Sequence, residues 1–549
     1  MKSNVLKHIR RKASDLAFNN ALYNWTLHHN ILGGSQPQGF VTIPTDGWPG
    51  DMEKGRWLCE GTFTLGGETF EIPNSHWYLE GLSQDWMAHI HGFSWLRDLR
   101  ALGGDQARLA ARALIESWID HHHGFDKVTW QNDFTGERLS HWIGCYDFFG
   151  ASAGEEFQDL FFNSLSRQAR HLCRALPGDS TGIAQLKAIK GLAYCGIALE
   201  GRESWLEVAL DLLQEETRKQ ILPDGGHITR SPAQLTEALQ IFIDIRCALK
   251  AAHYPVPGPM QHTIDRMAQA LRFFRYSDKK LCVFNGAQEG DINFLEAVLS
   301  KSNARGKTLT RLPQSGYERL TLGRSVIMMD TGSPPAYPHE RHHHAAPLAF
   351  EFIYGKERIF TSCGSHPFDP TWQDSLRATA AHNTLSIDHR NAAEIRHDGH
   401  FGRKHRKMSV TREDTHDACL IEATHDGYVS LNGITHRRRI YMGEQGHDIR
   451  GEDTLSCSIG AVNPKEIALR FHLHPRVLVS IIQDGTEALL RLPGGAGWRF
   501  HFSGGAFALE NSIYLGEGSR PRKTKQLVLY GTMESDFARI KWGLQREGR

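Results

Sequence analysis

The stretch "PHERHHHAAPLAFEF", residues 338–352, decides how the C-terminal part of this 549-residue chain is interpreted. His339, Glu340 and His343 match the H-E-x-x-H pattern of zinc proteases, which requires a helix that brings both histidines onto one face. A proline-rich stretch precedes the run and Pro347 follows it, so a helix has almost no room. The run therefore predicts loop and strand backbone, and we disfavour the protease alternative.

The hydrophobic period changes along the chain. From about residue 80 to 275, apolar residues recur at helical spacing, as in "AQLKAIKGLAYCGIAL" (184–199). From about residue 316 the period is two, and glycine or aspartate turns separate many β-rich stretches. We predict an all-α half followed by an all-β half that forms a large antiparallel sandwich. The predicted strands lie in 318–330, 348–362, 382–389, 419–425, 437–443, 467–474, 477–485, 487–495, 497–502 and 525–533.

Composition excludes several classes of protein. The chain has 63 Lys+Arg and 62 Asp+Glu, a net charge of +1, so nothing points to nucleic acid as a partner. Its nine cysteines are scattered singly, without the spacing of a disulfide framework. No apolar run approaches the ~20 residues of a membrane span, and no secretory signal is visible. At this length we expect more than one domain.

Four motifs occur in a characteristic order. They are "QILPDGGHITRSP" (220–232), "HHHAAPLAFEFIYGKERIFTSCG" (342–364), "LRATAAHNTLSID" (376–388) and "HDGY" (425–428). Together with the α-then-β order, they resemble the heparinase II/III-like proteins, which are relatives of bacterial polysaccharide lyases. The resemblance covers most of the chain from about residue 90.

The resemblance implies an N-terminal (α/α) toroid, an incomplete barrel, over residues 1–310, and an antiparallel β-sandwich over 316–549. It also implies cleavage of an acidic, uronate-containing polysaccharide by β-elimination. In that reaction the uronate carboxylate is neutralised, a Tyr or His takes the C5 proton, and a second group protonates the departing O4. Many relatives also hold one structural zinc ion in the sandwich.

Transferred to this sequence, the resemblance assigns roles residue by residue. His342 matches the family's catalytic histidine, and Tyr428 is the proton-transfer candidate on the sandwich side. His227 follows a glycine turn in a toroid loop, where it either replaces a missing polar group or caps the turn. His344 and His382 match two zinc ligands, and Ser362 stands where the family has an aspartate ligand.

The toroid departs from the family pattern. Relatives have an Asn-His pair where this chain has Ile183 and Ala184, and a Tyr-His pair where it has Gln234 and Leu235. Glutamine has no proton to give up near neutral pH, so it does not replace a catalytic tyrosine. We keep Gln234 as a substrate-binding candidate. Arg230 and Arg377 are candidates for binding the substrate carboxylate, with surface solvation as the rival interpretation.

Three functions from different classes remain. The first is a polysaccharide lyase of acidic glycans such as glycosaminoglycans, and the second is a catalytically degenerate, glycan-binding relative. The third is the disfavoured zinc protease. An acidic polysaccharide or oligosaccharide is the expected partner, and homodimerisation stays open. The resemblance favours the periplasm or cell envelope, whereas the lack of a visible signal leaves the cytoplasm open.

Overall fold

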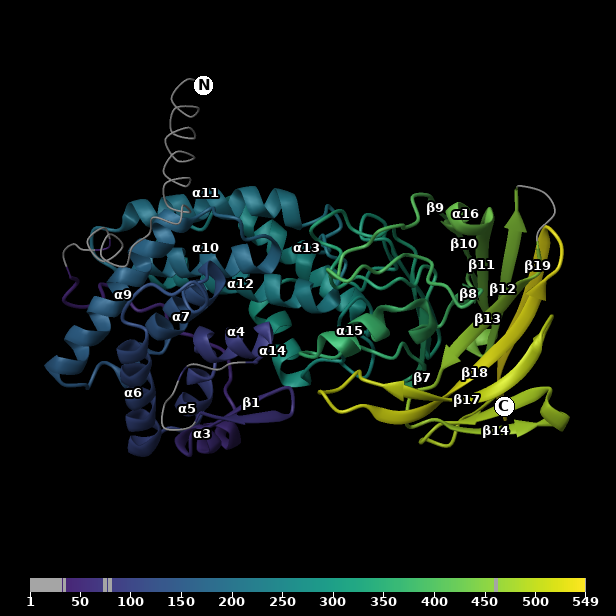
Figure 1. Cartoon of the computed structure of the whole chain (residues 1–549), viewed down its shortest axis with the longest axis horizontal. Helices are drawn as coiled ribbons and strands as arrows, with labels where there is room; N and C mark the ends of the chain where they lie inside the picture. Colours follow the sequence, from purple (N-terminus) through teal and green to yellow (C-terminus); the bar gives the residue numbers. More distant parts are fainter. Residues whose placement is uncertain (1–31, 33–35, 73–76, 78–80, 459–462, 549) are drawn as a thin grey trace, which may run out of the picture. The chain divides into compact units, whose positions relative to one another are not determined.

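The computed structural model describes residues 32, 36–72, 77, 81–458 and 463–548. The chain divides into two compact units. The first contains Met1–Arg218 and Gln240–Gln261, and the second contains Lys219–Leu239 and His262–Arg549. Figure 1 shows the helices and strands of both units, coloured along the chain. Within the described residues, no helix has both the length and the apolar character needed to cross a membrane.

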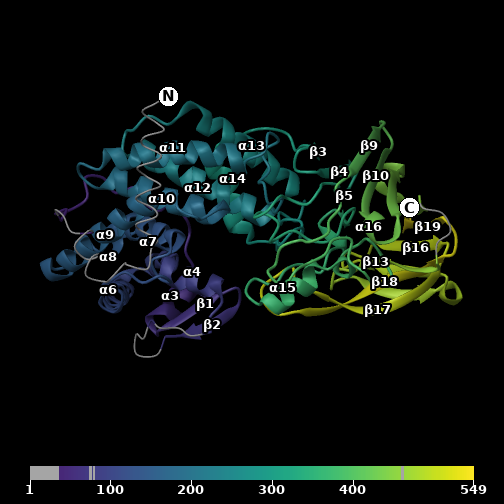
Figure 2. The ribbon, with the colours of Figure 1, turned by 45° about the horizontal axis from the view of Figure 1, so that its top comes forward.

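The first unit is mainly helical. Its β1–β2 hairpin lies beside α3 and α4 (Figure 2). The helices α11, α12 and α13 each have residues in both units. The elements are α3 (Met52–Cys59), β1 (Thr62–Leu65), β2 (Glu68–Glu71), α4 (Gln84–Gly92), α5 (Leu96–Leu102), α6 (Gly104–His121), α7 (Asn132–Gly144), α8 (Tyr146–Phe149), α9 (Glu155–Ala175), α10 (Gly182–Ala198), α11 (Glu203–Gln220), α12 (Pro232–Ala251) and α13 (Gly258–Phe274).

Helix pairing in this unit follows from side-chain size and spacing. The helices α7 and α10 approach closely because Gly136 and Gly191 face each other, and a Cβ on Gly191 would lie 2.4 Å from the Gly136 Cα. In α6 the buried residues Ala111, Ile115 and Trp118 recur at helical spacing and form one apolar stripe. Small residues therefore set the helix separation where two inner helices meet.

The second unit contains most of the β structure. Its strands form an eight-stranded sheet in the order β14-β15-β16-β19-β12-β11-β10-β9, a four-stranded sheet β17-β18-β13-β8, and a five-stranded sheet β3-β4-β5-β6-β7. The elements are α14 (Ile292–Ser302), β3 (Arg311–Leu312), β4 (Tyr317–Leu322), β5 (Ser325–Asp330), β6 (Phe350–Tyr354), β7 (Glu357–Phe360), α15 (Pro370–Arg377), β8 (Leu385–Ile387), β9 (Met408–Asp414), β10 (Cys419–Tyr428), α16 (Val429–Asn432), β11 (Ile434–Gly443), β12 (Asp448–Cys457), β13 (Lys465–His472), β14 (Leu478–Ile482), β15 (Glu487–Arg491), β16 (Gly497–Ser503), β17 (Ala506–Tyr514), β18 (Arg522–Met533) and β19 (Phe537–Glu547).

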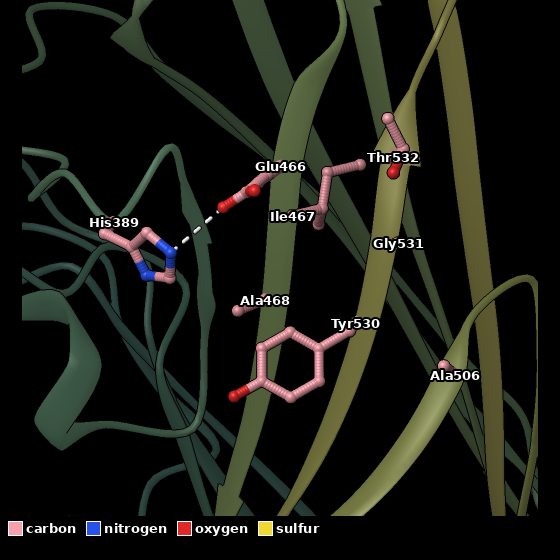
Figure 3. Close-up of a pocket in the computed structure, with 8 residues that line it drawn as sticks. All are labelled: His389, Glu466, Ile467, Ala468, Ala506, Tyr530, Gly531 and Thr532. Atoms are coloured by element: carbon pink, nitrogen blue, oxygen red, sulfur yellow. Dashed lines mark hydrogen bonds and ion pairs between the residues drawn. The ribbon is translucent and has the colours of Figure 1, made fainter.

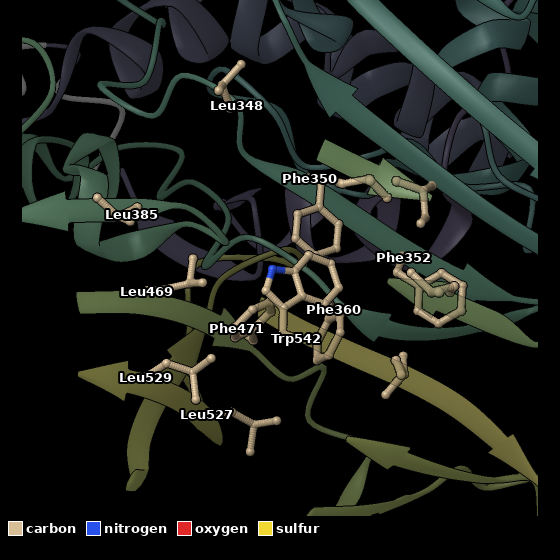
Figure 4. Packing of buried hydrophobic residues seen from close by; sticks show 14 of the residues in the cluster. Leu348, Phe350, Phe352, Phe360, Leu385, Leu469, Phe471, Leu527, Leu529 and Trp542 are labelled. Atoms are coloured by element: carbon tan, nitrogen blue, oxygen red, sulfur yellow. The ribbon is translucent and has the colours of Figure 1, made fainter. Parts of the chain in front are cut away.

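An aromatic core joins the three sheets (Figure 4). Phe350 of β6 stacks on Trp542 of β19, with ring centroids 5.3 Å apart and planes 5° apart. Phe471 of β13 packs on the same tryptophan at 5.0 Å. Alternate residues of each strand point inward, so every sheet contributes one apolar face to this core. The large area that these rings bury makes the core the main source of the unit's stability.

The predicted order, a helical toroid without a closed barrel followed by a large antiparallel β region, is confirmed for the described residues. The domain boundaries at 310 and 316 stay predictions. By internal contacts, residues 219–239 and 262–310 group with the sandwich.

Candidate functional site

The histidine run is not helical. Residues 337–349 form turns and irregular backbone before β6, as the sequence predicted. Short turns close it, since the His339 N–H donates to the Ala336 carbonyl at 2.8 Å and the His343 N–H to the Glu340 carbonyl at 2.9 Å. This geometry contradicts the zinc-protease alternative, because His339 and His343 do not share a helix face.

His342 and His344 both lie against the turn at Asn285 and Gly286. A Cβ on Gly286 would lie 3.1 Å from the Cβ of His342, and the glycine has φ +79°, so this position favours glycine on both counts. The Gly286 N–H donates to Nε2 of His344 at 2.9 Å. The two histidines differ in access, however, because His342 is exposed and His344 is buried. Only His342 can therefore meet a substrate directly.

The electrostatics of His342 suit a base. Although its ring reaches solvent, the surrounding protein displaces enough water to lower its pKa below 6.5. The positive charge of Arg377 acts in the same direction, and Glu237 opposes it. At neutral pH the imidazole is therefore mainly neutral and able to accept a proton.

His227 is held in place by its neighbours. It is buried, its Nδ1 lies 2.7 Å from the Thr229 hydroxyl, and its Nε2 lies 3.1 Å from the Gln220 amide oxygen. Burial lowers its pKa to about 3, and the charges of His339 and His342 add to this. Both ring nitrogens are occupied, which matches the turn-capping alternative for His227.

A buried polar network underlies the His342 loop. The Arg230 guanidinium pairs with Asp330 and donates to the carbonyls of Ser315 (2.6 Å), Gly316 (3.0 Å) and Ser333 (3.3 Å). Its side chain is only 4% exposed. Arg230 is thus used internally, which corrects its assignment as a substrate-carboxylate ligand.

The network continues through residues that the sequence analysis did not select. Asn285 donates through Nδ2 to Tyr317 and to Asp330 (3.1 Å), and its Oδ1 accepts from the His344 N–H at 2.9 Å. Tyr317 in turn donates to the Arg230 carbonyl at 2.7 Å. The available signals were the Asn-Gly turn dipeptide at 285 and the aspartate that ends the apolar strand at 330.

Arg377 and Gln234 also have positions that the sequence left open. Arg377 is buried and donates to the carbonyls of His343 (2.9 Å), Gly399 (2.8 Å) and Glu340 (3.3 Å). It holds the backbone of the histidine run, and the predicted role of Arg377 as a substrate-carboxylate ligand stays a prediction. Gln234 is half-buried at the start of α12.

The proposed zinc ligands do not converge as a metal site. The His344 and His382 rings are 4.4 Å apart at their centroids and tilted by 34°, a near-stacked pair. Nε2 of His344 accepts a backbone N–H, and Nε2 of His382 faces the Leu376 carbonyl at 2.9 Å. Among the side chains of these three proposed ligands, the buried Ser362 Oγ and His382 Nδ1 lack hydrogen bonds. In the described part of the chain, no group of three or more His, Cys, Asp or Glu side chains is arranged to hold a metal. This donor set does not fit zinc, which takes four converging ligands.

Tyr428 lies in the sandwich interior. It is fully buried, and its hydroxyl donates to the Leu385 carbonyl at 3.0 Å. Burial raises its pKa above the usual value of 10. This position gives Tyr428 a packing role and keeps it from the solvent-facing side of His342.

Two buried histidines, His425 and His436, form a chain of hydrogen bonds that ends at Asp453. The Gly427 N–H donates to Nδ1 of His425, which fixes a proton on Nε2 of that ring. His425 therefore donates to Nδ1 of His436 (3.1 Å), and His436 donates to Asp453 (2.7 Å). Arg438 and Trp542 also donate to Asp453, at 2.8 and 3.0 Å. The carboxylate is thus the acceptor at the end of a fully buried network.

Comparison with known proteins covers nearly the whole chain. Residues 86–305 match the family model described as "Heparinase II/III N-terminus", and residues 304–543 match "Heparinase II/III-like, C-terminal". A full-length relative is the FtsZ-localized protein C of Caulobacter vibrioides (strain NA1000 / CB15N). It is 30% identical over 548 residues, which cover 94% of this chain and 92% of the relative.

Solved structures share the fold at low identity. A heparinase III crystal structure has a TM-score of 0.74 at 15% identity, and the match covers 95% of this chain and 88% of that one. The heparan sulfate lyase HepC of Pedobacter heparinus has a TM-score of 0.63 at 14% identity, covering 95% and 87%. With both family models matched in order over residues 86–543, the chain belongs to the heparinase II/III-like family.

Proposed function

We propose that this protein is a polysaccharide lyase that cleaves an acidic, uronate-containing glycan by β-elimination, with His342 as the proton-transfer group. The observation that carries this proposal is the exposed, mainly neutral imidazole of His342 on a loop whose backbone Arg377 anchors. The family and the lyase folds that it resembles support the same reaction class.

The chemistry is self-consistent with a single histidine. His342 takes the C5 proton of the uronate, the C5 electron pair forms the C4–C5 double bond, and the C4–O4 bond breaks. The imidazolium then returns its proton to O4 when C5–H and O4 lie on the same face of the sugar. One imidazole thus acts first as base and then as acid.

The substrate carboxylate needs a cation, because its charge otherwise opposes loss of the C5 proton. Arg230 and Arg377 are occupied by the fold. Arg341 is exposed, adjacent to His342 in sequence and close enough to lower its pKa. We assign carboxylate binding to Arg341.

The helical half contributes less than in the family pattern. Ile183 and Leu235, which replace polar family residues, are buried apolar side chains. No second acid is therefore assigned there, and we expect slow turnover, since general acid–base groups each contribute about 10²–10⁴-fold.

The test is a panel of uronate polysaccharides incubated with the full-length protein, with ultraviolet absorbance of the unsaturated uronide as the readout. We expect slow product formation that His342→Ala abolishes and that His416→Ala leaves unchanged. His416 is a suitable control because its side chain is 92% exposed in the turn between β9 and β10. Product formation by His342→Ala at the wild-type rate would contradict the assignment, as would no product from any glycan.

A second candidate is a non-catalytic role, which the replaced toroid residues and the FtsZ-localized relative favour. In this case the chain associates with FtsZ, and any glycan binding is a relic of the family fold. Co-sedimentation with polymerised FtsZ tests it directly. Saturable co-sedimentation that His342→Ala does not alter, without any unsaturated product, supports this role over the first.

A further inference from the structure

The outer face of the four-stranded sheet carries a cavity of about 450 Å³ whose lining does not include His342 (Figure 3). Its volume is within the range of small-molecule binding sites. The lining comes from β13, β17, β18 and the turn after β8. The residues are His389, Glu466, Ile467, Ala468, Ala506, Tyr530, Gly531 and Thr532.

One aromatic ring stands among small residues on this face. Across the sheet, Ser386, Ala468, Tyr530 and Ala506 form one row of paired residues. Only the tyrosine is large; Ala468 on one side of it is buried, and Ala506 on the other side is exposed (Figure 3). Its hydroxyl donates to Glu510 at 2.6 Å, which fixes the orientation of the half-buried ring.

A turn places a polar wall opposite the ring. Asp388 and His389 both have left-handed backbone, with φ of 49° and 54°. The turn is fastened to β13, because the Asp388 N–H donates to the Glu466 carbonyl at 2.9 Å and the Asp388 carboxylate accepts the Glu466 N–H at 3.1 Å. Non-glycine residues in this conformation cost free energy, so such turns are retained where a side chain must be presented.

The side chains on this wall add little stability. His389 and Glu466 pair at 3.0 Å, yet they are 67% and 75% exposed. Exposed ion pairs of this kind contribute little to folding. Both side chains are therefore accessible to a ligand in the cavity.

We propose that this cavity binds an uncharged pyranose unit of an oligosaccharide. Tyr530 offers an aromatic face and edge to the apolar C–H groups of the sugar. His389, Glu466 and Thr532 supply donors and acceptors for its hydroxyl groups. Glu466 in the lining repels a carboxylate or sulfate, and the adjoining cations are engaged by the fold, Lys465 with Asp388 at 3.0 Å and Arg470 with the Ser386 hydroxyl at 2.8 Å. The site therefore favours an uncharged sugar over the acidic sugar expected at His342. The site does not depend on the proposed cleavage reaction.

The experiment measures binding by saturation-transfer difference NMR on the full chain, in both the wild type and the His342→Ala background. The probes are cellotetraose, maltotetraose and chitotetraose, with tetragalacturonate as the acidic comparison. We expect at least one neutral probe to bind. Any binding of tetragalacturonate should be the same in the wild type and in Tyr530→Ala. Persistence of neutral binding in the His342→Ala background separates this site from the lyase proposal.

Variants locate the site. Tyr530→Ala should weaken binding of the neutral probe by at least about tenfold, whereas Tyr530→Phe should retain most of it because the ring remains. Tyr441→Ala removes a half-buried tyrosine from β11 in the eight-stranded sheet and serves as the matched control. The proposal is overturned if no neutral probe binds, if Tyr530→Ala binds like Tyr441→Ala, or if the acidic probe depends on Tyr530 instead.

Discussion

Replacement of Arg230 by methionine tests whether this arginine stabilises the fold or binds the substrate. The variant removes the partner of a buried carboxylate and the Arg230 donors to the carbonyls of Ser315 and Ser333, whereas the Gly316 carbonyl keeps the Thr331 N–H at 2.9 Å. From the described residues, the Asp330 carboxylate then keeps two donors, the Asn285 amide and the Gly332 N–H, each at 3.1 Å. Breaking a buried ion pair on one side costs about 3–5 kcal/mol. We expect the lower end of that range, because two donors to Asp330 remain.

Hydrogen–deuterium exchange of peptides from β4 and β5 measures this loss within the second unit alone. A loss of about 3 kcal/mol corresponds to exchange that is faster by roughly a hundredfold for amides that open with the unit. Arg341→Met is the matched control, since Arg341 is exposed, and we expect almost no change in exchange.

A double-mutant cycle adds the decisive comparison. In an Asp330→Asn background no buried carboxylate is left, so Arg230→Met should cost about 2 kcal/mol less than in the wild type. Unchanged exchange in Arg230→Met, combined with weaker binding of an acidic glycan, would refute the structural role and restore the substrate-ligand interpretation.

Three further outcomes follow from the buried groups. Tyr428→Phe should lose about 1 kcal/mol of stability, through its hydrogen bond to Leu385, and keep wild-type lyase activity; a loss of about a hundredfold in rate would instead make it a catalytic acid. Burial alone would raise the pKa of Asp453, but Arg438 and His436 lower it from 3.8 to about 2. The ionised Asp453 should therefore stabilise the sandwich above pH 4, and about 2 kcal/mol of this stability should be lost as the pH falls from about 4 to 2. Acid unfolding of the wild type and of Asp453→Asn measures this, and the variant should lack that part of the pH dependence. Dialysis against EDTA should leave the melting temperature unchanged, and elemental analysis showing one zinc per chain would contradict our interpretation of His344 and His382.

The periodicity of the sequence predicted much of the fold, and the strands β9, β12 and β19 were missed for different reasons. In β9 a partly buried position is taken by Arg412, whose charge is compensated by Glu318 of another strand, so the apolar alternation is broken. In β19 the buried Ile540, Trp542 and Leu544 alternate with outward-facing residues, so this strand was predictable from its sequence. In β12, the inward-facing Asp453 interrupts the apolar pattern. The core tolerates this charge because Arg438 from the neighbouring strand compensates it. A single sequence does not show such compensation, since the partner lies on another strand.

The site was harder to predict for a related reason. The motif placed His342 and His344 two residues apart, but residue spacing does not determine which ring reaches solvent. The Asn285–Gly286 turn, nearly 60 residues earlier in the chain, decides this by occupying His344. Arg230 and Arg377 likewise looked free because the carbonyls that use their donors are distant in sequence.

The grouping of residues 219–239 with the sandwich has a consequence for how this fold is inherited and engineered. A fragment cut at the start of the C-terminal family match, residue 304, would lack both Arg230 and Asn285 and would expose Asp330 to an interior without counter-charge. The sandwich therefore cannot be exchanged between relatives as an independent domain at that boundary. Chimeras should retain wild-type solubility only when 219–239 and 262–303 are transferred together with the strands they support.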